Sequence, residues 1–248
     1  TYERGALDLF FRTLLIETSV GYTLYGEKPV SEEGFRTAGV LIGEFHHPLI
    51  RTGSIWKTGF RVWEESGLST IKSNYEIHVS DIPYNGWREI QFINVNSFMD
   101  TVDRNLSLFQ YALGPKVTPA ALLEKFRDPK ENLASIFHEN WTLNGVILGF
   151  GTQSALHGSR SEYLHTHLIS KSHKLGKGYG FSAIHHDAPS FGFSSLDQEF
   201  DQLNKEGLCT ASRESPTPRL PWFACFRNPE SDQLLADYKR VQPKLKGL

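Results

Sequence analysis

The sequence predicts a helix-rich α+β fold with a small antiparallel sheet. In most segments apolar residues recur at helical spacing. Residues 74–95 instead alternate apolar and polar side chains on both sides of Asn85-Gly86, a dipeptide that favours a hairpin turn. Because 39% of the 248 residues are apolar and 22% are charged, the composition is that of a globular domain. We expect a single domain over residues 1–248, with amphipathic helices packed on the hairpin.

Four elements are expected before the hairpin. Apolar residues at helical spacing predict an amphipathic helix over residues 3–17. Residues 22–25 are strand formers bracketed by glycines, which predicts a short strand. Two glutamates near the start of residues 31–43 suit the first turn of a helix, so a helix is predicted there. Aromatic residues between positions 50 and 63 predict another helix.

The hairpin is expected to pair residues 75–79 with residues 89–95. A long helix follows, because apolar residues at helical spacing over 98–113 precede Gly114-Pro115, which stops a helix. Thr118-Pro119 then opens a short helix.

The central stretch, residues 128–168, has further helix signals. Asp128-Pro129 suits a helix start, since Asp accepts from first-turn N–H groups and Pro needs no donor there. This helix would bury one apolar stripe, formed by Leu133, Ile136, Phe137 and Trp141. A second helix, with Thr142 available as a cap, would bury Leu143, Val146, Ile147 and Phe150.

Beyond the central stretch, lysines and glycines predict a mobile loop over residues 170–194. A C-terminal appendage, residues 195–248, would join the main domain through this loop. It is expected to contain a short helix over 195–206, an edge strand over 220–226 and a helix from Asn228 to about Pro243.

The glycines Gly149 and Gly151 allow two interpretations. They resemble the pattern that lets a backbone approach a pyrophosphate at a helix N-terminus. A dinucleotide site also needs a preceding strand and an acidic residue about 20 positions later, whereas Glu162 comes too early. Alternatively, the glycines end a helix or allow close packing. Because the apolar spacing before them is helical, we predict the second role and no nucleotide cofactor.

Three blocks of the chain resemble known sequences. They are residues 132–160 with their Leu148-Gly149-Phe150-Gly151, residues 21–29, and residues 220–224. In these blocks the chain is similar to a group of hypothetical proteins of chlamydial-type bacteria, with Ser154 standing where that group has Asn. The resemblance implies a bacterial lineage and a role at the envelope or towards a host. It favours a location outside the cytoplasm and brings no activity or catalytic residue with it.

Charge and cysteine content exclude several classes of function. With 26 basic and 28 acidic residues, the chain lacks the excess of Lys and Arg that drives binding to nucleic acid. No run approaches the roughly 18 apolar residues that a transmembrane helix needs. Cys209 and Cys225 are too few for a four-cysteine zinc site, and either pair as a disulfide or stay reduced.

Ten histidines suggest a metal site as an alternative. Neutral imidazoles can bind zinc or another divalent ion, which makes His46, His47, His165 and His167 the candidate ligands. On a helix, however, residues two apart point in different directions, and residues 163–168 are expected to be helical. Solvated or hydrogen-bonded histidines are therefore expected, and no metal cofactor is predicted.

The candidate catalytic residues are His185, His186 and Asp187, which could supply a base and its orienting carboxylate for hydrolysis. Their nucleophile would be one of Ser182, Ser190 and Ser194. No G-x-S-x-G motif presents a serine, and burial in an aromatic run would raise the pKa of the Cys225 thiol.

Tyr84 and Trp87 lie at the hairpin tip, where large aromatic residues are not easily buried, and are the candidate protein-binding residues. We expect a non-catalytic binding or structural protein whose partner is another protein. The alternative is a metal-dependent or serine hydrolase that uses the histidine clusters.

Overall fold

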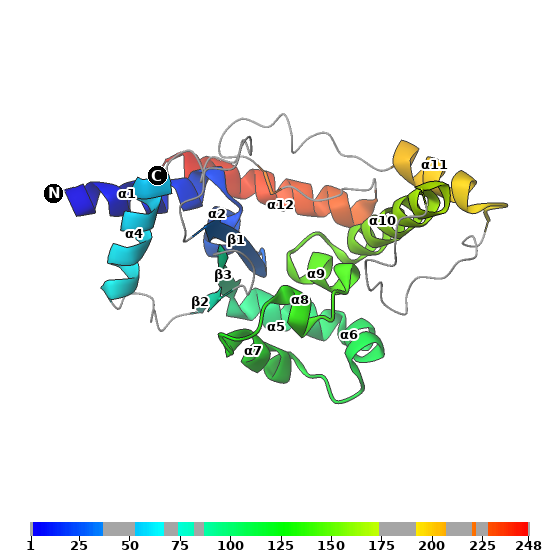
Figure 1. The fold of residues 1–248 in the computed structure, drawn as a ribbon, viewed down its shortest axis with the longest axis horizontal. Helices are drawn as coiled ribbons and strands as arrows, with labels where there is room; N and C mark the ends of the chain where they lie inside the picture. The colour runs from blue at the N-terminus through cyan, green and yellow to red at the C-terminus, as the bar shows by residue number, and fades with distance from the viewer. Residues whose placement is uncertain are drawn as a thin grey trace.

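The computed structural model describes residues 2–36, 53–66, 74–81, 87–173, 192–206, 220–221 and 228–247. Helices make up 68% of this part of the chain, and its three strands form one antiparallel sheet. The predicted helix-rich α+β fold is therefore confirmed (Figure 1). None of the helices in these ranges combines the length and apolar character that crossing a membrane requires.

The described residues of the N-terminal region form three helices and a strand, which are α1 (Tyr2–Glu17), α2 (Val20–Tyr25), β1 (Val30–Arg36) and α4 (Gly53–Glu65). Helices α1 and α4 confirm the predictions for these segments and pack against each other. Gly59 permits this close approach, because a Cβ there would lie 2.3 Å from the Ala6 carbonyl oxygen.

The predicted strand at residues 22–25 is wrong, because these residues belong to α2. Tyr22 is fully buried, and its ring meets the ring of Tyr238 edge-on at a centroid distance of 5.5 Å. Gly21 lets α12 come close, since a Cβ at Gly21 would lie 2.8 Å from Leu245 Cδ1. Packing against α12 (Pro229–Lys246) therefore overrides the strand propensity of the two tyrosines.

The predicted helix over residues 31–43 is also wrong, because its described part lies in β1. This strand pairs antiparallel with β3 (Trp87–Asn94), from Val30 opposite Ile93 to Arg36 opposite Trp87. A hairpin alone would leave one edge of β3 unpaired. Strand β1 covers that edge, and its two glutamates belong to a sheet instead of a first helical turn.

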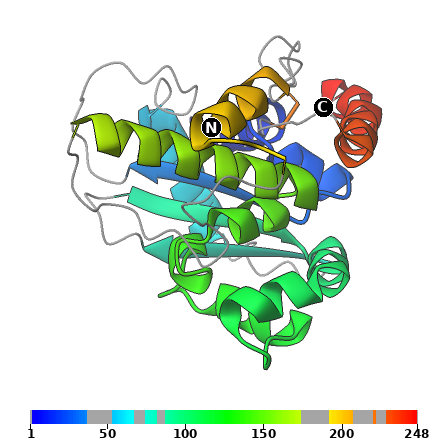
Figure 2. The same ribbon diagram turned by 90° about the vertical axis from the view of Figure 1, so that its right-hand side faces the viewer.

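The predicted hairpin is confirmed by β2 (Tyr75–Asp81) pairing antiparallel with β3, in the strand order β1-β3-β2. One face of the sheet is apolar and packs on α1 and α4 through Ile77, Val79, Ile90 and Phe92. The opposite face carries the row Glu32, Gln91 and His78, one residue from each strand. Figure 2 shows the strands side by side behind α9 and α10.

Five helices form the next layer, which are α5 (Val95–Arg104), α6 (Leu106–Leu113), α7 (Pro119–Arg127), α8 (Leu133–Ile136) and α9 (Trp141–Ile147). The single helix predicted over 98–113 is broken at Asn105, whose side-chain amide donates to the Thr101 carbonyl at 2.9 Å. A side chain that bonds back to the preceding turn in this way competes with helix continuation.

Asp128 ends α7, and Asn132 starts α8, so the predicted helix opening at Asp128-Pro129 is wrong. The Asn132 side chain accepts from Ser135 N at 2.9 Å, while the Ser135 hydroxyl accepts from Asn132 N at 2.9 Å. This reciprocal capping box satisfies more backbone donors than an aspartate alone. Trp141, predicted to be in the core, is 53% exposed, because α8 ends before its stripe can continue.

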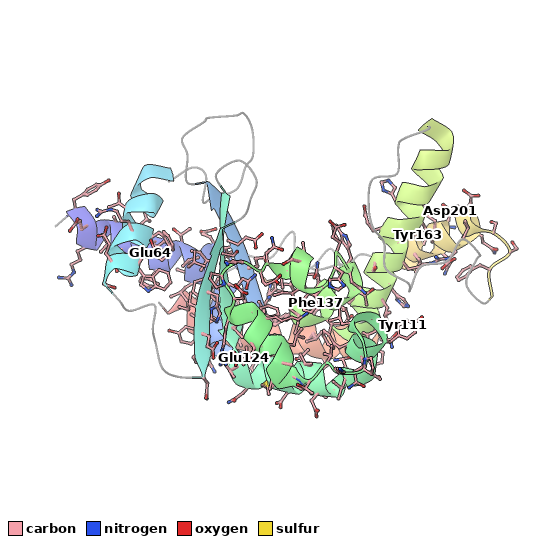
Figure 3. All side chains as sticks on the ribbon, turned by 60° about the horizontal axis from the view of Figure 1, so that its bottom comes forward. Glu64, Tyr111, Glu124, Phe137, Tyr163 and Asp201 are labelled. Atoms are coloured by element: carbon pink, nitrogen blue, oxygen red, sulfur yellow. The ribbon has the colours of Figure 1, made fainter. Side chains whose placement is uncertain are left out.

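The remaining helices are α10 (Thr152–His173), α11 (Leu196–Glu206) and α12. Arg160 of α10 and Glu199 of α11 form a buried ion pair, with an Nε–Oε1 distance of 2.9 Å. Figure 3 shows Tyr163 of α10 and Asp201 of α11 at the end remote from Glu64 of α4. The predicted helix from Asn228 is confirmed and continues past Pro243.

Three clusters of buried apolar side chains hold these layers together. The largest joins β1 and β3 to α5–α9, and within it the ring of Phe126 contacts the rings of Phe98 and Phe137. A second lies between the sheet and α1 and α4, and a third lies between α2 and α12. The predicted loop over residues 170–194 is wrong at its start, because residues 170–173 continue α10. Residues 174–191 and 222–227, which include most of the predicted loop and edge strand, lie outside the described residues.

Candidate functional site

One wall of a polar cleft is a stripe along α12. Asn228 and Pro229 fix the start of this helix, since the Asn228 side chain accepts from Ser231 N at 2.9 Å and Pro is suited to the first position. Residues spaced three or four apart then share one face of the helix. Those that line the cleft are Glu230, Gln233, Asp237, Arg240 and Lys244.

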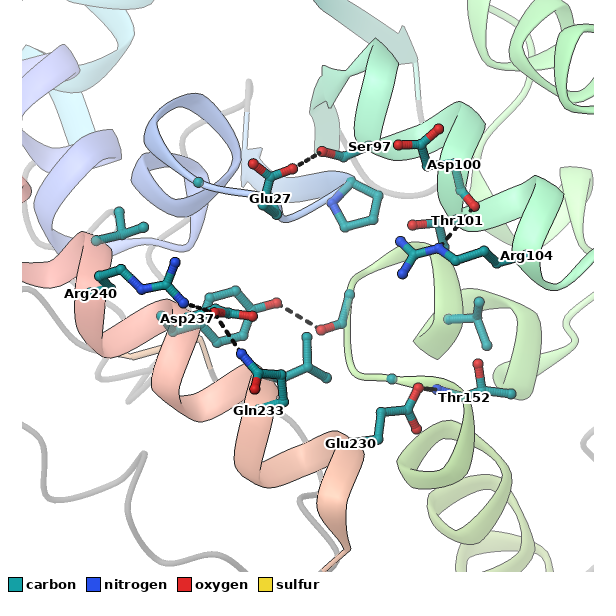
Figure 4. Close-up of a pocket in the computed structure, with 18 of the residues that line it drawn as sticks. Glu27, Ser97, Asp100, Thr101, Arg104, Thr152, Glu230, Gln233, Asp237 and Arg240 are labelled. Carbon is teal, nitrogen blue, oxygen red and sulfur yellow. Dashed lines mark hydrogen bonds and ion pairs between the residues drawn. The ribbon is translucent and has the colours of Figure 1, made fainter.

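The opposite wall is α5, whose first turn is capped by the Asn94 side chain accepting from Ser97 N at 3.2 Å. The residues that it contributes are Ser97, Asp100, Thr101 and Arg104. Figure 4 shows these side chains facing the α12 stripe across the cleft, with Glu27 at one end and Thr152 at the other. The cavity between the walls has a volume of about 940 Å³.

The turn after α9 contributes Gly149 and Gly151, which have positive φ angles of 75° and 81°. Helix α9 precedes this turn, as the apolar spacing predicted, but Asn140 caps it in place of Thr142 and it ends at Ile147, before Phe150. A Cβ at Gly149 would lie 2.9 Å from the Tyr238 hydroxyl oxygen. That hydroxyl donates to the Gly149 carbonyl at 2.7 Å, and burial raises the Tyr238 pKa above its usual range. Both glycines thus permit close packing against α12.

The Glu230 carboxylate occupies the N-terminus of α10. Its two oxygens accept from Thr152 N and from Gln153 N, each at 2.8 Å. These are the backbone donors that a pyrophosphate would need at this helix. The carboxylate satisfies them within the chain, and the helix dipole favours its negative charge.

The charged side chains of the cleft fall into two sets, those that bond to another side chain and those that do not. Asp237 accepts from Gln233 at 3.0 Å and pairs with Arg240, while Glu27 accepts from the Ser97 hydroxyl at 3.1 Å. Within the described part of the chain, Arg104 and Lys244 have no carboxylate partner, and the Asp100 carboxylate has no donor. Unused donors and an unused acceptor therefore face the same cavity.

Three titratable side chains, the buried Lys28 and the half-buried Glu32 and Glu33, lie behind the cleft. Lys28 is 2% exposed, and its ammonium donates to the Val30 carbonyl. Desolvation lowers the Lys28 pKa to about 7, against the opposing effect of Glu33 and Glu32. Desolvation likewise raises the pKa of Glu32 to about 8 and that of Glu33 to about 7. Lys28 packs against the backbone of Gly149, since a Cβ there would lie 3.2 Å from Lys28 Cγ.

The polar face of the sheet extends this group. Gln91 is buried, and its amide donates to Glu32 Oε2 at 3.3 Å. The Ser80 hydroxyl donates to Glu89 Oε2 at 3.4 Å, and burial raises the Glu89 pKa. These bonds connect the three strands through side chains and satisfy polar groups that the layer above removes from water.

The histidines predicted as metal ligands are only partly described. His165 lies on α10, is exposed, and stacks on Phe200 of α11 at a centroid distance of 5.8 Å. His167 lies on the same helix, with its side chain outside the description. His46 and His47 also lie outside the described residues. In the described ranges, no three His, Cys, Asp or Glu side chains group so that they could hold a metal ion.

Most other predicted site residues are not described, namely His185, His186, Asp187, Ser182, Ser190, Tyr84, Cys209 and Cys225. Trp87 begins β3, and only its backbone is described. The Ser194 hydroxyl donates to Gln198 at 2.7 Å, next to the start of α11.

Comparison of the chain with protein-family models, curated proteins and solved structures finds no match. The sequence alone did not predict the cleft between α5 and α12. Its α12 stripe was visible as charged residues at helical spacing, but nothing local in the sequence indicated that α5 would face it.

Proposed function

We propose that this protein is a non-catalytic binding protein that holds a small polar ligand in the cleft between α5 and α12. The observation that carries the proposal is the cleft itself. Its volume of about 940 Å³ is within the range of about 300–1,000 Å³ usual for small-molecule sites. Charged and amide side chains line both walls beside apolar residues such as Val146, Leu234 and Val241, which suits a small ligand that carries polar groups.

Hydrogen bonds fix the position of α12 relative to the neighbouring elements, which favours binding by a preformed site. The Tyr238 hydroxyl donates a hydrogen bond from α12 to the Gly149 carbonyl. The Glu230 carboxylate of α12 accepts one from Thr152 N at the start of α10. A preformed site avoids part of the ordering cost of binding. We also propose a bacterial origin for this protein, supported by the three sequence blocks that resemble hypothetical proteins of chlamydial-type bacteria.

The test is a screen of small polar compounds by amide NMR spectroscopy on the full chain. A ligand in the cleft should shift the amide signals of Gly149, Gly151 and Thr152. Gln233→Trp should abolish this response, because residue 233 is exposed on the cleft wall and a large side chain there would fill the cavity. Lys239→Trp is the matched control, since residue 239 is exposed on the same helix and does not line the cleft. Equal binding by both variants, or shifts confined to other regions, would refute the proposal.

A further inference from the structure

Arg104 presents an unused guanidinium fork to the cleft. Its Nε donates to the Asp100 carbonyl at 3.2 Å, which leaves both terminal nitrogens of the guanidinium without a protein acceptor in the described residues. In Figure 4 the side chain extends from α5 toward the middle of the cleft. A planar fork of this kind binds carboxylates and phosphates through two parallel hydrogen bonds.

The carboxylates on the α12 wall do not take the place of a ligand. Glu230 uses both oxygens on the first turn of α10, and Asp237 is paired with Arg240. Formal charges in the lining nearly balance, with four carboxylates against three cations. The unused hydrogen-bonding capacity is nevertheless mainly that of donors, because Arg104 and Lys244 are unpaired in the described structure.

We propose that the ligand carries a carboxylate or phosphate group that the guanidinium of Arg104 binds, and an amino or hydroxyl group that donates to Asp100. This inference rests on the proposed function, since it names the class of ligand for the same cleft. Asp100 and Arg104 lie four residues apart on one helical face, so a single small molecule can reach both side chains. The hydroxyl of Thr101 lies on the same wall and can donate to the same anion.

The first experiment compares charged compounds with neutral analogues by calorimetric titration of the full chain. The probes are lactate and glycerol phosphate, each set against its neutral counterpart, lactamide and glycerol. At least one charged probe should bind about ten to one hundred times more tightly than its counterpart, as expected for charge-assisted hydrogen bonds. The probe that binds separates carboxylate from phosphate recognition.

The second experiment uses variants. Arg104→Gln should weaken binding of the charged probe by at least about tenfold, and Arg104→Lys should restore only part of it, because an ammonium lacks the fork. Arg61→Gln is the control, since this exposed arginine pairs with Glu65 of α4 and Glu3 of α1 and does not line the cleft, and its loss removes the same charge. Thermal melts check that all three variants remain folded.

The binding of charged and neutral probes by the variants tests the role of Arg104. Tighter binding of a charged probe that is lost in Arg104→Gln and kept in Arg61→Gln supports the inference. If neutral compounds bind in the cleft as tightly as charged ones, or if Arg104→Gln binds normally, the inference fails while the proposed function stands. If no compound of either kind shifts the cleft amides, both fail.

Discussion

Gly151 is a position where backbone conformation and available space both require glycine. Its φ is 81°, and a Cβ would lie 2.9 Å from both Glu230 Cδ and Leu234 Cδ1. We predict that Gly151→Ala lowers the free energy of unfolding by about 1 kcal/mol or more, measured by urea denaturation. Gly192→Ala is the control, because Gly192 also has a positive φ, of 95°, but nothing lies within 4 Å of its added Cβ.

The control separates backbone strain from close approach, and an equal loss in both variants would argue against the packing role of Gly151. Neither NAD nor ATP should raise the melting temperature of the unmodified protein. A melting shift with either nucleotide that disappears in Gly151→Ala would restore the phosphate-binding interpretation.

Glu32 makes stability depend on pH. Desolvation, and next the nearby Glu89, raise its pKa from 4.5 to about 8. The folded state therefore holds the proton more tightly than the unfolded state, so stability is lost as pH rises from about 5 to 8. We predict that Glu32→Gln matches the unmodified protein at pH 5 and is more stable at pH 8 by at least about 1 kcal/mol.

The measurement is urea denaturation at both pH values. Glu65→Gln, which changes an exposed glutamate on α4, should leave the difference between pH 5 and pH 8 as it is. If Glu32→Gln retains the full pH dependence, desolvation of this half-buried carboxyl is not the source of that dependence.

At the scale of elements, helix starts depend on side-chain caps from Asn and Thr that differ in burial. Asn140 is 3% exposed, and its Oδ1 accepts from Thr142 N at 3.1 Å and from Leu143 N at 3.2 Å. We predict that Asn140→Ala costs about 1–2 kcal/mol, because the change leaves donors of α9 unsatisfied inside the protein.

Thr118→Ala provides the comparison, since Thr118 caps α7 with one bond of 3.1 Å to Ala121 N at an exposed position where water can replace it. Its cost should be smaller, at about 0.5–1 kcal/mol. Chemical denaturation of both variants measures the difference. A larger loss for Thr118→Ala would mean that burial does not control the strength of these caps.

At the scale of the whole molecule, α12 connects the N-terminal helices to the α9–α10 turn. The buried Tyr238 hydroxyl bonds the Gly149 carbonyl at 2.7 Å, and the same ring packs on Tyr22. We predict that Tyr238→Phe lowers stability by about 1–2 kcal/mol, since it leaves a buried carbonyl without its donor. Unfolding measured by circular dichroism should show this loss.

Tyr25→Phe removes a hydroxyl from the same cleft at a residue that is 42% exposed, and should change stability by less than about 0.5 kcal/mol. If both tyrosine variants behave alike, the connection through Tyr238 does not hold α12 in place. Amide exchange at Gly151 and Thr152 should also quicken in Tyr238→Phe alone.

The sequence by itself determined the fold class, the hairpin and most helices, because these depend on local periodicity and on turn residues. The alternation around Asn85-Gly86 required no knowledge of distant segments, and the same is true of the Thr118-Pro119 and Asn228-Pro229 helix starts. The role of Gly149 and Gly151 in packing was also predictable, since the helical spacing before them is a local property.

Tertiary structure alone decided the segments whose local preference lost to distant partners. Tyr22 is helical because α12 packs on it from more than two hundred positions away in the sequence. Glu32 is in a strand because β1 forms backbone hydrogen bonds with the edge of β3 that the hairpin leaves unpaired. The cleft belongs to the same class of feature: the charged stripe of α12 is visible in the sequence, but only the folded chain brings it opposite Asp100 and Arg104. The spacing of polar residues predicts which face of a helix is polar, whereas the element that this face contacts depends on the packing of the whole molecule.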